Sequence, residues 1–400
     1  MRKLVKTENS AYVKMLALYF ICLPLGAIKI GVIGSALKLV ALLPTIVFIF
    51  RQGRVIKLTR PVLFQIGLAF LALVSYVWSP FKIVWWRAAS GQMLFIILLL
   101  PTANMVLYPD EWDYLKKSLV WASRLTLLLV FLFSSFNADG RLYFTGVIAE
   151  DPNYLCTYFL FGAAFAVERI LSPGKVIGRL LAGAEILLYL FVDFQTGSRS
   201  GMVATAVVCA IYFLFYNRKE KYNIFRRILI VLLMAIAVII AFKYLPEDVA
   251  SRFSSESESL STGSNRYNLW GEAVYTFFHS DPLYSLFGWG AGNAAYANSE
   301  IVFDYEIPHN AFLHILLEEG LVGFLFYFGL IYSALKKAIT SKHIWKISIM
   351  IAMIVFSFSA SIIAFKPYWN IMLICLFTVY ENNPNYEVQN YENYAGNSPS

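Results

Sequence analysis

The stretch at 228–245 reads ILIVLLMAIAVIIAFKYL, and Lys243 is its one charged residue. Its length is close to the roughly 20 apolar residues that cross a bilayer as an α-helix. The whole chain of 400 residues has a similar character, because 59% of its residues are hydrophobic and only 14% are charged. A soluble domain carries about 25% charged residues. The sequence therefore predicts an integral membrane protein.

Eleven other apolar runs of this kind predict further helices. They cover 11–28, 32–50, 61–78, 90–107, 118–136, 154–171, 176–193, 201–216, 309–335, 347–365 and 368–380. The last run has 13 residues, which is short for a span. We expect an all-α, polytopic fold of about 12 transmembrane helices, with 11 and a re-entrant end as the alternative. This pattern excludes a single-pass enzyme and a soluble dehydrogenase, kinase or nucleic-acid-binding domain, and barrel strands would show ten-residue alternation instead.

The distribution of charge predicts the orientation. With the N-terminus in the cytoplasm, the connections at 51–60, 168–179, 218–227 and 336–346 fall inside, and all four are net basic. The 63-residue connection at 246–308 falls outside and holds nine Asp or Glu against two Arg. This arrangement follows the positive-inside rule, so the net charge of +8 indicates topology rather than nucleic-acid binding. Both termini are expected in the cytoplasm.

The chain therefore divides into five segments. They are the N-terminal transmembrane helices (1–150), helices 6–9 (151–245), a large extracytoplasmic loop between helices 9 and 10 (246–308), the C-terminal transmembrane helices (309–380) and a tail (381–400). The tail is rich in Asn and Tyr and has no apolar periodicity, so we expect it to be disordered and cytoplasmic.

The long loop contains its own structural signals. Apolar residues recur at helical spacing from Asn265 to Phe278 and predict an amphipathic helix that lies on the membrane or over a cavity. Gly288, Gly290 and Gly292 follow, and they predict turns. Long structured connections commonly carry function, so this loop is the expected location of a site.

The connection between the seventh and eighth helices has the pattern of an anion site. Gly197 and Gly201 allow the backbone to turn closely, and Ser198 or Thr196 can cap the eighth helix. The free N–H groups and positive dipole end of that helix would lie beside Arg199. A phosphate is the natural ligand of such a group. The alternative is that the Arg199 side chain extends to lipid headgroups.

Two further residues border the long loop. Arg266 is one of two Arg in an acidic segment, and it predicts either a second anion contact or a structural ion pair. His309 begins the tenth predicted helix, beside Asn310, where a neutral imidazole can act as a general base. The alternative is that His309 caps this helix. Gly320 and Gly323 lie near the same side of the helix and predict a smooth face that packs tightly on a neighbour.

The seventh helix also carries two acids. Glu185 and Asp193 indicate either ion coupling or ion pairs with Arg87 or Arg199. His279 and His314 are expected to be structural.

Taken in this order, the motifs resemble the O-antigen polymerase and O-antigen ligase superfamily of bacterial polysaccharide-assembly enzymes. The resemblance rests on Thr196–Gly201, on a large loop after the ninth helix, and on His309-Asn310 followed by nine residues and Gly320-x-x-Gly323. The segment Glu150-Asp151-Pro152-Asn153 is also similar to one that is frequent in these proteins. The similarity extends from about 150 to 335.

This resemblance implies a metal-independent, cofactor-free glycosyltransferase of the bacterial inner membrane, with its active site on the periplasmic face. Its donor is a glycan on undecaprenyl pyrophosphate, and its acceptor is a second lipid-linked repeat or lipid A core. A chain-length regulator is a further expected partner. Arg199 and Arg266 match the arginines that hold the pyrophosphate, and His309 matches the histidine that activates the acceptor hydroxyl. The supporting residues are Ser198, Asn310, Gly320 and Gly323.

Polymerase and ligase differ in the acceptor, and the sequence favours the polymerase. The segments Asp151-Pro152-Asn153 and Pro308–Phe312 look closer to repeat-unit polymerases. The alternative within the superfamily is an O-antigen ligase. A polysaccharide flippase or other transporter is the alternative of another class, but it would place polar residues along a central cavity. Here the candidate residues are expected at one outer face.

Overall fold

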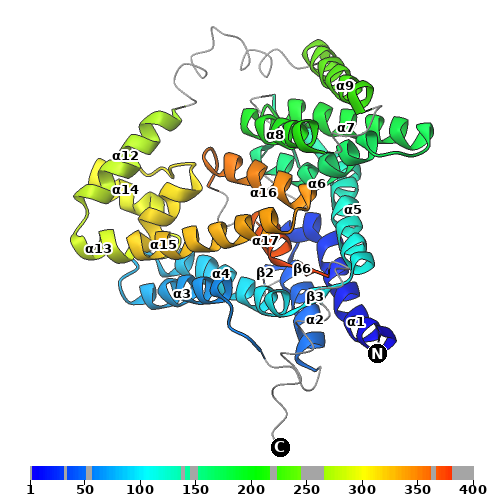
Figure 1. Cartoon of the computed structure of the whole chain (residues 1–400). Helices are drawn as coiled ribbons and strands as arrows, with labels where there is room; N and C mark the ends of the chain where they lie inside the picture. The colour runs from blue at the N-terminus through cyan, green and yellow to red at the C-terminus, as the bar shows by residue number, and fades with distance from the viewer. Residues whose placement is uncertain are drawn as a thin grey trace, which may run out of the picture.

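The computed structural model describes residues 2–30, 34–50, 56–136, 140–144, 152–216, 223–244, 265–361 and 366–380. Within these ranges the chain is mostly helical (Figure 1). The predicted tail at 381–400, the motif residues Glu150 and Asp151, and the first part of the loop at 246–264 lie outside the described residues.

Each of the twelve predicted apolar runs overlaps a helix. These helices are α1 (Arg2–Ile21), α2 (Leu37–Ile49), α3 (Arg60–Val74), α4 (Lys82–Asn104), α5 (Pro109–Phe133), α6 (Pro152–Leu171), α7 (Val176–Gln195), α8 (Arg199–Phe215), α9 (Asn223–Tyr244), α15 (Ala311–Thr340), α16 (Ile344–Ser357) and α17 (Lys366–Leu376). The long loop adds α12 (Arg266–His279), α13 (Pro282–Phe287) and α14 (Ala294–Val302).

Short elements complete the described chain. They are the 3-10 helices η1 (Leu23–Ala27) and η3 (Ser75–Val77), the antiparallel pairs β1 (Lys29–Ile30) with β2 (Gly34–Ser35) and β4 (Ser134–Phe136) with β5 (Leu142–Phe144), and the parallel pair β3 (Val106–Leu107) with β6 (Thr378–Val379).

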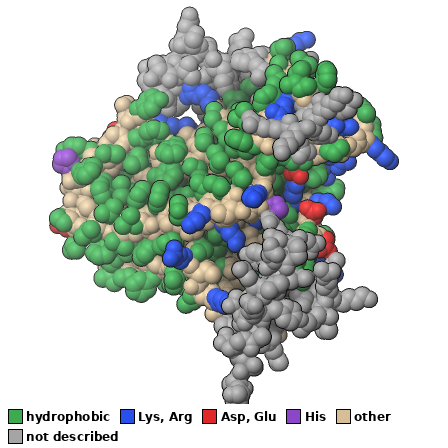
Figure 2. Space-filling view, viewed as in Figure 1, with side chains coloured by type: hydrophobic (Ala, Val, Ile, Leu, Met, Phe, Trp, Pro, Cys, Tyr) green, Lys and Arg blue, Asp and Glu red, His purple; other side chains and the backbone are tan. Residues whose placement is uncertain are grey.

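Four helical segments of the described chain are long and apolar enough to cross a membrane. They are Arg60–Val77, Lys82–Asn104, Pro152–Leu171 and Ala311–Thr340. Apolar side chains are also strongly exposed on α5, α7 and α9, and Figure 2 shows many hydrophobic side chains on the described part of the surface. Because water-facing surfaces rarely collect so much apolar area, these faces fit contact with lipid. The all-α membrane fold is supported, and the number of 12 spans stays a prediction.

Helix α6 is the most enclosed of these spans, with 78% of its apolar window buried. It packs against α5, α7, α8 and α16. Small residues permit this approach: a Cβ at Gly162 would come within 2.6 Å of the Tyr189 ring. Ser123 adds a polar clasp from α5, because its hydroxyl donates to the Tyr158 carbonyl at 2.6 Å and accepts from the Gly162 N–H at 2.9 Å. Helix α6 is therefore enclosed by α5, α7, α8 and α16.

The connections predicted to be cytoplasmic contact one another at one end of the bundle, here called the basic end. Lys116 bonds both oxygens of Glu168 at 2.7 Å, and the hydroxyls of Ser172 and Tyr216 lie 2.7 Å apart. The Lys346 ammonium donates to the Phe377 carbonyl at 2.9 Å. The Trp112 and Trp345 rings are 5.8 Å apart between centroids and link α5 with α16. Together these contacts join the starts of α5 and α16, the ends of α6 and α8, and the residues after α17 at one end of the bundle.

The connections predicted to lie outside meet at the opposite end, here called the loop end. Trp78 donates through Nε1 to the Gly288 carbonyl at 2.9 Å, and the Asn293 amide donates to the Ser79 hydroxyl at 2.8 Å. The long loop therefore packs onto the turn between α3 and α4. The predicted turns are confirmed, since Gly288, Gly290 and Gly292 all have positive φ.

The predicted amphipathic helix is confirmed as α12, but its buried face differs in part from the expected apolar one. Leu269, Ala273 and Thr276 are buried against α14 and α15, whereas Val274 and Phe278 are exposed. The buried face follows the small residues that allow close packing of three helices.

The tenth predicted helix is wrong in two respects. It begins at Ala311 rather than His309, and it is interrupted at Gly320, where φ is 63° and ψ is −167°. The interruption brings Gly320 against the backbone of the long loop, because a Cβ there would lie 2.4 Å from the Leu286 carbonyl carbon. His309 and Gly320 therefore do not lie on one side of a single continuous helix, contrary to the prediction from the sequence.

Single cysteines near the two ends of α15 test the orientation. Tyr305, at the loop end, is 63% exposed, and Thr340, at the basic end, is exposed. Because basic connections stay inside, an impermeant maleimide should label Tyr305→Cys in outer-membrane-permeabilised cells and Thr340→Cys only after lysis. The unmodified chain gives the background, since three of its four cysteines are buried. Labelling in the reverse order would overturn the orientation.

Candidate functional site

The turn that leads into α8 is built by its own polar residues. Gly197 adopts a φ of 61°, which favours glycine. Ser198 is the N-cap, and its hydroxyl accepts from the Gly201 N–H at 3.2 Å, so the predicted cap is confirmed. Thr196 instead supports the turn, because its hydroxyl accepts from the Ser198 N–H at 3.2 Å. Arg199 is the first residue of α8 and is half-buried.

This turn is fastened to the start of α6. A Cβ at Gly201 would lie 2.4 Å from the Cβ of Cys156, so glycine lets the two helix backbones approach. The Cys156 sulfur also lies 3.2 Å from the Thr196 hydroxyl oxygen. The position of Arg199 is therefore set by the packing of α8 on α6.

Arg141 lies at this candidate site and was not predicted from the sequence. Its Nε donates to the Thr196 carbonyl at 2.7 Å, and its Nη2 donates to the Asn153 side-chain oxygen at 3.0 Å. It thus ties the α7–α8 turn to the Pro152-Asn153 motif at the start of α6. A signal existed, since Arg141 is the one basic residue of the acidic connection at 137–151.

The two residues of the His-Asn motif have different structural roles at the start of α15. Asn310 is the N-cap, and its side-chain oxygen accepts from the Phe312 N–H at 2.9 Å and from the Leu313 N–H at 3.2 Å. The alternative that His309 caps the helix is therefore wrong. His309 is half-buried and has a φ of 46°, a left-handed conformation that few residues other than glycine adopt.

Described contacts connect the α8 turn with the start of α15. The rings of Phe312 and Phe358 are 4.9 Å apart between centroids. Close beyond Phe358, the Ser361 carbonyl accepts from the Tyr154 hydroxyl at 3.1 Å. Tyr154 lies in the same first turns of α6 that hold Cys156 against the α8 turn. The structure thus brings the Pro152-Asn153, Thr196–Gly201 and His309–Phe312 motifs to the loop end of the bundle.

Arg266 joins this end through a different set of contacts. It is the first residue of α12 and is half-buried. Helix α12 packs on α14 and on the first part of α15 in an apolar cluster that includes Ala273 and Leu317. The glycines of the signature contact other elements. Gly320 lies against the Leu286–Gly288 backbone, and a Cβ at Gly323 would lie 3.2 Å from Leu71 of α3.

The loop end also holds a histidine and several acids. His314 Nε2 lies 2.7 Å from the Glu318 carboxylate, so its expected structural role has a specific partner. In the loop, burial and then the neighbouring Asp304 raise the pKa of Glu272. Glu272 is therefore an acid–base group on α12 itself.

The acids of α7 have partners inside the bundle. Arg124 of α5 holds both oxygens of Glu185 at 2.9 Å, so Glu185 forms its ion pair with Arg124 and not with either of the two suggested partners, Arg87 and Arg199. Asp193 accepts from the Thr205 hydroxyl of α8 at 2.9 Å. The bidentate Arg124–Glu185 pair neutralises a charge that would otherwise be costly in the membrane.

These features define a multi-pass membrane protein with polar turns gathered at one end of a helical bundle. Residues 185–328 match the family model described as O-Antigen ligase, a family of glycosyl-transfer enzymes. The match contains Arg199, Arg266 and His309, and it supports the O-antigen ligase and polymerase superfamily. The resemblance drawn from the motifs is confirmed over this segment. A comparison with curated proteins finds no match.

Substitution of Asn310 tests the cap on α15. Asn310→Ala should lower the free energy of unfolding by about 1 kcal/mol, because two N–H groups lose their acceptor. Asn310→Asp should retain the stability, since it keeps an oxygen at the positive end of the helix. Thermal unfolding of the purified protein in detergent measures both changes. Equal losses in the two variants would show that the side-chain oxygen is not the stabilising group.

Proposed function

We propose that this protein is an inner-membrane glycosyltransferase that uses an undecaprenyl-pyrophosphate-linked glycan as donor and polymerises surface-polysaccharide repeat units. The observation that carries the proposal is the connection of the Arg199 turn to the His309 turn through the start of α6. An anion-binding turn and a base at one end of the bundle are the two groups that transfer from a pyrophosphate requires.

The pyrophosphate would be held at the start of α8. A guanidinium binds phosphate oxygens in a bidentate manner, and the N–H groups of a helix N-terminus favour an anion. Arg199 provides the first group, and the α8 turn provides the second. Arg266 supplies a second cation from α12. As the glycosidic C–O bond breaks, these groups stabilise the negative charge that develops on the leaving oxygen.

His309 would act on the acceptor. Its imidazole takes the proton from a sugar hydroxyl while that oxygen attacks the anomeric carbon of the donor. The bond to the pyrophosphate breaks, and undecaprenyl pyrophosphate leaves with the electron pair. Asn310 positions His309, because the cap determines where α15 begins.

We favour the polymerase over the ligase because of the Pro152-Asn153 and Pro308–Phe312 segments. In the ligase the same groups would act, and lipid A core would be the acceptor. The alternative of another class is a flippase. It is less favoured because the half-buried acid Glu185 is neutralised by Arg124 rather than facing a polar path.

Cells that lack the gene separate these functions. A surface polysaccharide of single repeats indicates a polymerase, whereas lipid-linked polymer without attached chains indicates a ligase. Accumulation of repeat units on the cytoplasmic side indicates a flippase and would overturn the proposal. Transfer by the purified protein from a lipid-linked donor, with chelator present, tests metal independence directly.

Substitution of His309 distinguishes the imidazole from its unusual backbone conformation. Both Asn and Gly tolerate positive φ, so His309→Asn and His309→Gly should accumulate normally but lose about 10²- to 10⁴-fold in transfer rate. His279→Ala is the matched control, since His279 is an exposed residue at the end of α12. Variants that retain more than about a tenth of the rate would remove His309 as the general base.

Substitution of Arg199 tests the pyrophosphate contact. Arg199→Lys keeps the charge but loses the planar fork, so it should lose about 10²-fold in rate, nearly as much as Arg199→Ala. Arg60 is the matched control, because it is likewise the first residue of a helix, at the opposite end of the bundle. Arg60→Ala should keep the wild-type rate at equal expression. Full activity of Arg199→Ala would exclude this residue from the site.

A further inference from the structure

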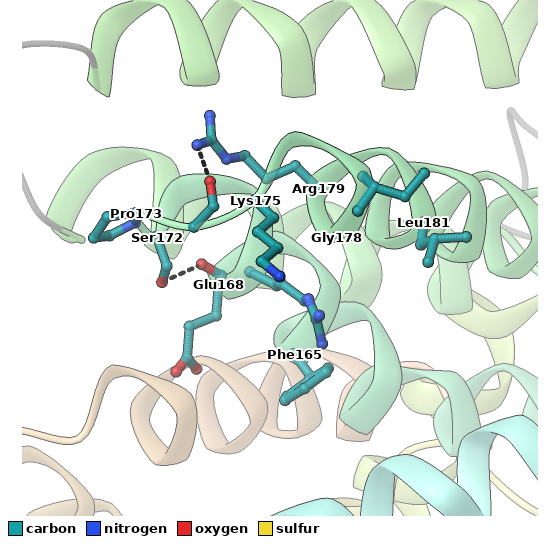
Figure 3. A pocket seen from close by; sticks show the side chains of 11 residues that line it. Phe165, Glu168, Ser172, Pro173, Lys175, Gly178, Arg179 and Leu181 are labelled. Atoms are coloured by element: carbon teal, nitrogen blue, oxygen red, sulfur yellow. Dashed lines mark hydrogen bonds between the residues drawn. The ribbon is translucent and has the colours of Figure 1, made fainter.

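A cavity of about 460 Å³ lies at the basic end, between the last turns of α6 and the first turns of α7. Figure 3 shows the side chains that line it. Three of them are cationic: Arg169 at the end of α6, Lys175 before α7, and Arg179 in its first turn. Helix α7 has 20 residues, so about 30 Å of helix separates this cavity from the α8 turn.

The three cations have few partners. Within the described part of the chain, none of them forms an ion pair with a carboxylate. Arg179 donates through Nη2 to the Gly174 carbonyl, and its Nε is buried with no partner among the described residues. The Arg169 guanidinium lies against α7 at Gly178, where a Cβ would be 3.0 Å from Nη2.

The one carboxylate in the lining does not neutralise this group. Lys116 bonds both oxygens of Glu168 at 2.7 Å, and the Tyr212 hydroxyl donates to it at 2.8 Å. Figure 3 shows the Glu168 carboxylate turned away from the Arg179 guanidinium. The positive end of the α7 dipole adds to the field. The cavity is therefore positive, and it fits an anion.

An apolar strip begins at the cavity and continues along α7. Ile177 and Leu181 line the cavity and are 61% and 64% exposed, and Val176 and Leu180 beside them are also exposed. When a helix contacts the bilayer, its exposed aliphatic side chains point toward the acyl chains of the lipids. A basic group directly next to such a strip matches a phosphate headgroup joined to lipid tails.

We propose that this cavity binds the phosphate headgroup of an anionic phospholipid from the cytoplasmic leaflet, with its acyl chains along the α7 strip. Basic pockets between helices on the cytoplasmic side commonly bind such headgroups. The chemistry recognised is a phosphate, and the strip assigns it to a lipid rather than to free phosphate. This site is separate from the proposed transfer site and does not depend on it.

Binding of defined lipids to the purified protein in detergent tests the proposal. Native mass spectrometry should show phosphatidylglycerol retained more strongly than phosphatidylcholine. The triple variant Arg169→Gln, Lys175→Gln and Arg179→Gln should weaken phosphatidylglycerol binding by roughly fivefold for each cation removed. The control with Lys57, Lys336 and Lys342 changed to Gln has the same change in charge and should bind as the wild type does. The double variant Arg169→Gln with Lys175→Gln keeps the Arg179 bond to Gly174. It should also bind phosphatidylglycerol more weakly, which would show that the loss in the triple variant is not caused by misfolding.

Two further measurements distinguish binding of a lipid from binding of free phosphate. Ile177→Ala with Leu181→Ala should weaken phosphatidylglycerol binding while all three cations remain. Inorganic phosphate should compete only weakly. Three results would each overturn the proposal: equal retention of the two lipids by the wild type, equal losses in the basic triple variant and its control, or full displacement of the lipid by inorganic phosphate.

Discussion

The structure at the loop end depends on backbone hydrogen bonds across the break in α15. A helix interrupted at Gly320 leaves carbonyls of the preceding turn without their usual N–H partners. The long loop supplies them: the Trp289 N–H donates to the Leu317 carbonyl and the Gly290 N–H to the Glu318 carbonyl, both at 2.9 Å. Because buried backbone groups must be satisfied, the loop and the break require each other.

This requirement explains why glycines occur in both segments that meet here, the long loop and α15. A Cβ at Gly288 would lie 2.2 Å from the Glu318 carbonyl oxygen, and one at Gly320 would lie 2.5 Å from the Gly288 nitrogen. The two backbones can approach this closely only without side chains. The loop then reaches the end of α3, where the hydroxyl of Ser75, the first residue of η3, accepts from the Ala291 N–H at 3.1 Å. One set of contacts thus joins α3, the loop and α15.

The parts of the fold that could be predicted were those governed by local pattern. Hydropathy located twelve helices, and the Ser198 cap and α12 followed from side-chain chemistry and helical spacing. The break at Gly320 could not be predicted, because glycine is also tolerated within membrane helices and only the loop shows why the helix stops. The links made by Arg141 and Arg124 could not be predicted either, because each joins segments that lie far apart in the chain.

The break also changes what positions the His309 turn. In a continuous helix, the membrane-spanning part of α15 would determine the direction of its first turns. Here Gly320 separates these turns from the span, and they are held instead by α12 and by the ring contact of Phe312 with Phe358. The turn at Arg199, by contrast, is fastened directly to the buried helix α6. The proposed anion site is therefore part of the rigid bundle, whereas the proposed base is placed by the packing of the long loop. A change in the long loop would then alter the geometry proposed for the acceptor without disturbing the turn proposed to bind the donor.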